Sequence, residues 1–138
     1  MSLTMFDNPM LEQVVSFTEA RHNVLAGNIA NFDTPGYRIR DLSTEEFQAK
    51  LKEAVEASHA DPSDQADGME ETMASESTRS AFDSVENAKH TLVFHDNSNM
   101  DIEQQAAELT KNQMEYNLAL SLLTGNFKSL EAAISERP

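Results

Sequence analysis

The segment DIEQQAAELTKNQMEYNLALSLLTGNFKSLEAAI, residues 101–134, carries the strongest periodic pattern in the chain. Asp101 is a suitable N-cap with Gln104 three residues later, so we predict that a helix begins there. Ten positions then follow at alternating steps of four and three, which is typical of a coiled-coil-like seam. They are Ile102, Ala106, Leu109, Gln113, Tyr116, Leu120, Leu123, Phe127, Leu130 and Ile134.

A helix with one apolar stripe must bury that stripe against a partner. Unbroken, residues 101–134 span on the order of 50 Å at 1.5 Å per residue. A matching pattern occurs near the N-terminus, after Asn8 as N-cap and Pro9 in the first turn. Its positions are Leu11, Val15, Thr18, His22, Leu25 and Ile29. We predict that the two helices pack lengthwise, and that the uncovered part of the longer helix contacts neighbouring subunits.

The first helix is predicted to end near Asn31. Pro35 restricts Thr34 to extended conformations, and Gly36 favours positive φ, so these residues suit a type II turn. Asn28 and Asn31 carry short amide side chains, which we interpret as caps for the last helical carbonyls. A second interpretation is that the same turn contacts adjacent subunits. Residues 37–40 then alternate aromatic or aliphatic with basic residues, which indicates a short extended piece.

The middle of the chain is acidic. Ser43 to Glu46 has the spacing of a capping box, which predicts a second helix to about Ala57. Residues 53–86 contain ten acidic residues and one basic residue, so we predict that residues 58–88 form a mobile or partner-ordered insert. Residues 91–94 are a short β-prone run.

The predicted fold is therefore mainly α. Its N- and C-terminal helices pair as an elongated coiled-coil-like bundle, and its middle segment is short β or extended and prone to disorder. The predicted division is 1–40, 41–100 and 101–138, with the first and last parts forming one helical domain.

Composition limits the function. The net charge of −14 opposes simple electrostatic binding to nucleic acid. The absence of cysteine excludes disulfides, thiolate metal sites and a cysteine nucleophile. No cleaved secretory signal is visible, and no stretch approaches the ~18 apolar residues of a membrane span.

Catalytic and metal patterns are weak. Asp61, Asp64 and Asp67 are spaced three apart, whereas a calcium loop needs ligands at alternate residues. His90 and His95 are five residues apart, and His22 and His59 have no second ligand near them at helical spacing. Common nucleotide, hydrolase and zinc-protease motifs do not occur. The sequence thus predicts no enzyme activity, no cofactor, no metal and no small-molecule substrate.

One motif is long and specific. It runs Asn28, Ile29, Ala30, Asn31, Phe32, Asp33, Thr34, Pro35, Gly36, Tyr37 and Arg38. It resembles the N-terminal signature of the bacterial flagellar rod and hook family, in which a helix ends in Asn-Ile-Ala-Asn before Thr-x-Gly-Tyr and a basic residue. Residues 97–102, 112–117 and 123–130 are similar to the C-terminal helix of that family. The resemblance covers about residues 8–57 and 95–134, and the acidic insert has no counterpart in it.

The resemblance implies a structural subunit of the flagellar basal body rod. It implies export by the flagellar type III apparatus without a cleaved signal, assembly at the proximal rod in the periplasm, self-association in a helical rod, and torque transmission for motility. Implied neighbours are the adaptor FliE, the membrane ring protein FliF and the rod protein FlgC. Two alternatives stay open: another rod protein such as FlgC itself, and a soluble helical adaptor or export chaperone with the same seams.

Overall fold

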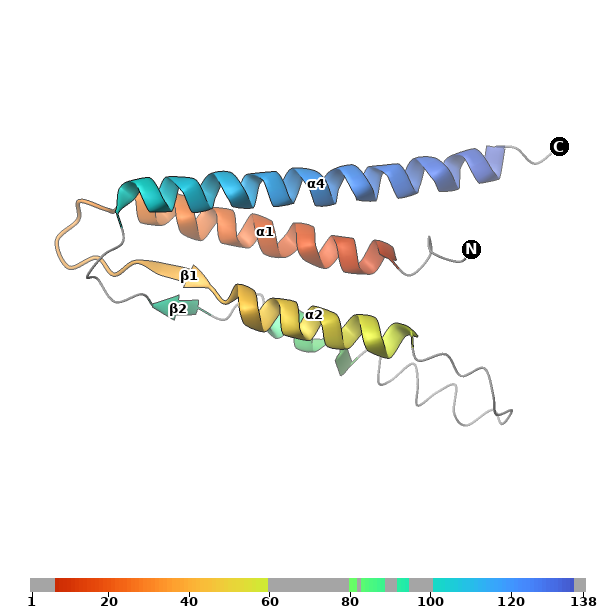
Figure 1. Ribbon diagram of the computed structural model, residues 1–138, viewed down its shortest axis with the longest axis horizontal. Coiled ribbons are helices and arrows are strands. Elements are labelled where there is room, and N and C mark those ends of the chain that lie inside the picture. The colour runs from red at the N-terminus through yellow and green to blue at the C-terminus, as the bar shows by residue number, and fades with distance from the viewer. Residues whose placement is uncertain (1–6, 60–79, 82, 89–91, 95–100, 136–138) are drawn as a thin grey trace. The chain divides into compact units, whose positions relative to one another are not determined.

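The structure is a computed structural model, and it describes residues 7–59, 80–81, 83–88, 92–94 and 101–135 (Figure 1). Its helices are α1 (Asp7–Ala30), α2 (Thr44–His59) and α4 (Ile102–Ser135), and its strands are β1 (Arg40–Leu42) and β2 (Leu92–Phe94). Residues 80–81 and 83–88 are also helical. The predicted mainly α fold is confirmed.

Helices α1 and α4 lie side by side along their length, as predicted (Figure 1). They run antiparallel, because Asn28 near the end of α1 contacts Gln105, whereas Thr18 contacts Asn112 further along α4. α4 has 34 residues and α1 has 24, so at 1.5 Å per residue α4 is longer by about 15 Å. This pair is called the helical pair below.

The turn that follows α1 has the predicted type II geometry. Gly36 has a φ of 77°, a value that glycine adopts at no steric cost. The Tyr37 amide donates to the Thr34 carbonyl at 3.1 Å, closing the turn around Pro35 and Gly36. The turn brings the chain from the end of α1 to the strand β1, which begins at Arg40 rather than at Tyr37.

The chain divides into two compact units. One comprises Met1–Asp41 with Val93–Pro138 and contains the helical pair, and the other is Leu42–Leu92. β1 and β2 form a two-stranded sheet, and both unit boundaries fall within these strands.

The second unit contains α2, which begins where the capping box predicts. The Ser43 hydroxyl accepts a hydrogen bond from the Glu46 amide at 3.3 Å. Phe47, Ala54, Val85 and Ala88 are buried.

Two predicted boundaries differ from the structure. α1 begins at Asp7, so Asn8 lies inside the helix and is not its N-cap. Within the predicted mobile insert, residues 60–79 and 82 lie outside the described residues, but residues 80–81 and 83–88 form helix, which the sequence analysis did not anticipate. Some of the residues considered above as metal ligands also lie outside the described residues. They are Asp61, Asp64, Asp67, His90 and His95.

Candidate functional site

A buried amide joins three segments of the first unit. Asn28 is 0% exposed at the end of α1. Its Nδ2 donates to the Arg40 carbonyl at 2.6 Å and to Gln105 Oε1 of α4 at 3.0 Å. Its Oδ1 accepts from the Tyr37 hydroxyl at 3.1 Å and from the Arg40 amide at 3.3 Å. One side chain therefore holds the turn, the start of β1 and the start of α4 together.

The two asparagines of the signature have different roles. Asn31 caps the helix as predicted, because its Nδ2 donates to the Gly27 carbonyl at 2.8 Å. The capping hypothesis for Asn28 is wrong, since its side chain bonds to Arg40, Gln105 and Tyr37 and not to a carbonyl of α1. Asn28 lies inside the last turn of α1 and faces α4, whereas Asn31 follows the helix end at Ala30 and reaches back to the Gly27 carbonyl.

A buried arginine makes a second link between the same segments. Arg21 donates from Nε and Nη2 to the two carboxylate oxygens of Asp41, at 2.9 and 2.7 Å. Nη2 also donates to Glu108 Oε2 of α4 at 2.9 Å. The hydrogen bond to Asp41 is the main cause that raises the pKa of Arg21 above its ordinary value, against the opposing effect of burial. Two carboxylates thus compensate one buried cation.

The inner face of α4 carries polar and small residues. Its buried positions are Gln105, Asn112 and Ala119, which are spaced seven residues apart. Asn112 Nδ2 donates to the Thr18 carbonyl of α1 at 2.7 Å. The sequence analysis missed all three, because it followed the neighbouring stripe, which is richer in large apolar residues. The regular step of seven, with two carboxamides in it, is the signal that identifies this face.

The predicted seam of α4 lies beside this inner face. Half-buried seam residues are Leu109, Gln113, Tyr116, Leu123 and Leu130. Exposed ones are Ile102, Ala106, Leu120, Phe127 and Ile134. On α1, Thr18 and Leu25 are buried, and Leu11, Val15, His22 and Ile29 are half-buried. The role of these residues in packing and assembly stays a prediction.

The signature residues after Asn28 lie at or near the surface. Ile29 and Tyr37 are half-buried, and Ala30, Asn31, Asp33, Thr34, Pro35 and Gly36 are exposed. Tyr37 is linked to the buried part of the signature, because its hydroxyl donates a hydrogen bond to Asn28 Oδ1. The signature therefore combines one buried anchor with an exposed turn.

The helical pair also has a hollow along one side. Its volume is about 220 Å³, and it is lined by Thr18, Glu19, His22, Asn23, Asn112, Gln113 and Tyr116. Asn112 Oδ1 is buried and has no hydrogen-bond partner in the part of the chain that the structure describes. Four of the lining residues belong to the predicted seams, so these seams meet along one side of the pair.

The described residues contain no group of three or more His, Asp or Glu side chains placed to hold a metal ion. Among the described helices, none combines the length and apolarity that a membrane crossing requires. What the arrangement does provide is mechanical: hydrogen bonds and ion pairs that fix two long helices and a turn in one register.

Comparisons with known proteins agree with the resemblance. A family model described as flagella basal body rod protein matches residues 18–38. The flagellar basal body rod protein FlgB of Aquifex aeolicus (strain VF5) is 29% identical over 128 residues, covering 93% of this chain and 92% of that protein. FlgB of Bacillus subtilis (strain 168) is 26% identical, covering 91% and 90%, and FlgB of Escherichia coli (strain K12) is 26% identical, covering 86% of each. No solved structure matches the chain.

Proposed function

We propose that this chain, whose resemblance to the flagellar rod family is confirmed along nine-tenths of its length, is a structural subunit of the bacterial flagellar basal body rod. The main support for the proposal is the position of the family match in the chain. Residues 18–38 contain Arg21, Asn28 and Tyr37, which fix the turn and the register of the helical pair.

The geometry suits a load-bearing part. Sliding α4 along α1 breaks the bonds of Gln105, Glu108 and Asn112 to α1 together, because all three lie on one helix. The exposed apolar residues of α4, including Phe127 and Ile134, need neighbours to cover them. A subunit with a fixed register and uncovered apolar sides fits a helical assembly that transmits torque, and this role needs no catalytic group.

The finer features belong to the same proposal. They are export by the flagellar type III apparatus without a cleaved signal, a place in the proximal rod, and contact with FliE, FliF and FlgC. The likeness to FlgB proteins from three distant bacteria supports the proximal position over that of FlgC. The acidic insert carries charge that no feature of the described residues explains.

A soluble adaptor or export chaperone is not favoured, because the relatives are described as rod proteins and the match extends over nearly their whole length. The two functions predict different destinations for the protein. A rod subunit is recovered in purified basal bodies, whereas a chaperone stays in the cytoplasm as a small oligomer.

The test is a deletion strain complemented with an epitope-tagged chain. We expect loss of swimming on soft agar, restoration by the complementing gene, and tagged protein in the rods of purified basal bodies. Complete basal bodies in the deletion strain, or a tag found only in the cytoplasm, contradict a structural role in the rod.

A further inference from the structure

Helix α4 turns a partly polar face, rather than its most apolar stripe, toward α1. Its buried positions are Gln105, Asn112 and Ala119, and two of these three carry carboxamides. Leu120 and Phe127 of the predicted seam are instead 40% and 52% exposed. Because the burial of apolar surface is the main driving force for packing, the apolar pattern of α4 favours a different rotation of this helix.

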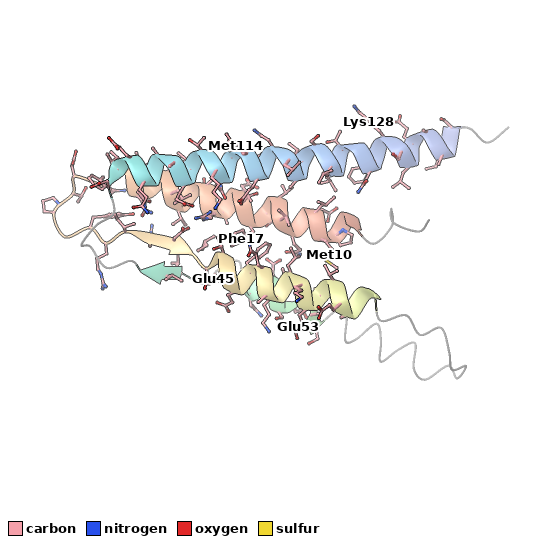
Figure 2. All side chains as sticks on the ribbon, in the orientation of Figure 1. Met10, Phe17, Glu45, Glu53, Met114 and Lys128 are labelled. Carbon is pink, nitrogen blue, oxygen red and sulfur yellow. The ribbon has the colours of Figure 1, made fainter. Side chains whose placement is uncertain are left out.

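The observed rotation and the one that buries the seam are close to each other. The observed face is completed by Gln105, Asn112 and Ala119, and the seam by the residue that follows each of them. Both faces share the half-buried residues Leu109, Tyr116, Leu123 and Leu130. Successive residues are about 100° apart around a helix, so a turn of α4 by about 50° exchanges one face for the other. Met114, which is 66% exposed and lies on the side of α4 away from α1 in Figure 2, stays outside in both rotations.

Three polar links between the described parts of α4 and α1 hold the observed rotation. They are Gln105 with Asn28 at 3.0 Å, Glu108 with Arg21 at 2.9 Å, and Asn112 with the Thr18 carbonyl at 2.7 Å. A turn of about 50° moves a side-chain atom by about 5 Å at the ~5–6 Å radius of a helix with its side chains. Such a displacement breaks all three hydrogen bonds, whose donors and acceptors must stay within about 3.2 Å. The links therefore oppose the rotation that the seam favours.

The observed rotation also carries a cost. Asn112 Oδ1 is buried and has no hydrogen-bond partner among the described residues. A buried acceptor without a partner destabilises the packing, whereas a polar residue inside a helical pair fixes how the helices fit together. The face that α4 presents to α1 is thus selected by its polar contacts and not by the largest apolar burial.

We propose that the three links act as a rotational lock, which holds α4 about 50° away from the rotation that its apolar seam favours. Without the links, α4 turns so that the seam packs against α1. The lock keeps Leu120 and Phe127 uncovered in the single chain. This property belongs to one copy of the chain, so it goes beyond the proposed function and does not depend on it.

The lock is tested by removing its three side chains from α4 in the purified chain. The triple variant combines Gln105→Ala, Glu108→Ala and Asn112→Ala. Alanine favours the helix and leaves no unpaired polar side chain on this face. The matched control removes the same three residue types at exposed positions of α4, and it combines Gln104→Ala, Glu115→Ala and Asn117→Ala.

The chain has no cysteine, so a single introduced cysteine reports its own exposure through its rate of alkylation by a thiol reagent. Ala119→Cys lies at a position that is 4% exposed and becomes accessible when α4 turns. Ala106→Cys lies at an exposed position of the seam and becomes covered by α1. With the lock intact, Ala106→Cys should react faster than Ala119→Cys. In the triple variant we expect the order of the two rates to be reversed, and in the control variant we expect it to be unchanged.

Three results overturn the proposal. They are an unchanged order of rates in the triple variant, a reversed order in the control variant, and equally fast reaction of both cysteines at the rate of the urea-unfolded chain. The last result would mean that the seam does not hold the two helices together. Because the measurement uses the isolated chain, its failure leaves the proposed function untouched, whereas absence of the protein from basal bodies refutes the proposed function and leaves the lock untouched.

Discussion

Replacing Asn28 by alanine should destabilise the helical pair more than any other single amide deletion in the signature. The Asn28 side chain is 0% exposed and makes four hydrogen bonds, two as donor and two as acceptor. Alanine leaves Gln105 Oε1 and the Arg40 backbone without these partners. Gln105 is itself only 2% exposed, so water cannot replace the lost donor without disturbing the packing.

The expected loss follows from the groups left unpaired. Each buried polar group without a partner costs about 1–3 kcal/mol. The Tyr37 hydroxyl is excluded from the sum, because Tyr37 is half-buried and its hydroxyl can turn to water. Arg40 is exposed, so water can also replace its lost partner. Counting Gln105 Oε1 alone, we expect Asn28→Ala to lower the free energy of unfolding by about 2 kcal/mol. That is a large part of the ~5–15 kcal/mol of a typical domain.

The assay is urea unfolding of the purified chain, followed by far-ultraviolet circular dichroism. Asn31→Ala is the matched control, because it removes one exposed hydrogen bond to the Gly27 carbonyl and should cost about 1 kcal/mol or less. Equal losses in the two variants, with an unchanged dependence on urea, would refute the argument that Asn28 joins the three segments.

Three further predictions follow from the same structure. Arg21→Met should lower the free energy of unfolding by about 2 kcal/mol, less than for a fully buried pair because Glu108 is partly exposed. The pKa of Arg21 is raised in the folded chain, so the stability that its charge contributes is fully present below its pKa in the unfolded chain and is lost only as pH rises through its pKa in the folded chain. Urea unfolding at neutral and at mildly alkaline pH should therefore show the same loss for Arg21→Met. Ala119→Leu, at a position 4% exposed, should overpack the pair and cost about 1–3 kcal/mol in urea unfolding, whereas Ala107→Leu, at an exposed position of α4, should be nearly neutral in the same assay. Leu120→Asp should change the stability of the isolated chain by less than about 1 kcal/mol, because Leu120 is 40% exposed, yet prevent recovery in basal bodies and swimming. Normal motility of this variant would show that the predicted seam at Leu120 does not hold the subunit.

Local sequence rules predicted the elements of this fold well. The capping box at Ser43, the turn at Pro35 and Gly36, and the start of α4 after Asp101 each depend on a few neighbouring residues. Such signals are strong because backbone geometry and side-chain type are linked within one turn. The pairing of α1 with α4 also followed, since both helices carry apolar positions at steps of four and three.

The rotation of α4 against α1 was not predictable from apolar spacing. α4 carries apolar residues on both flanks of the line formed by Gln105, Asn112 and Ala119, so hydrophobicity alone does not choose the inner face. The choice depends on partners distant in sequence: Gln105 meets Asn28, and Glu108 meets Arg21. An isolated sequence gives no sign that Arg21 is buried, because arginine is usually exposed.

On α4, two of the three buried positions carry carboxamides, whereas several leucines are exposed, and this has a consequence for assembly. In a free subunit the exposed leucines favour aggregation, because exposed apolar surfaces associate without specificity.

The charge distribution along the chain opposes such non-specific association. Residues 53–86 hold ten acidic residues against one basic, whereas α4 holds four against two, so repulsion between free copies comes largely from outside α4. Repulsion of this kind is screened beyond about 8 Å at physiological salt, and the less strongly charged α4 can therefore still meet a neighbour at short range. Only a contact that covers much apolar surface and pairs its few charges overcomes the residual repulsion, which favours specific neighbours over random aggregation. Neutralising acidic residues in the insert should accordingly raise non-specific association while leaving the register of the helical pair unchanged.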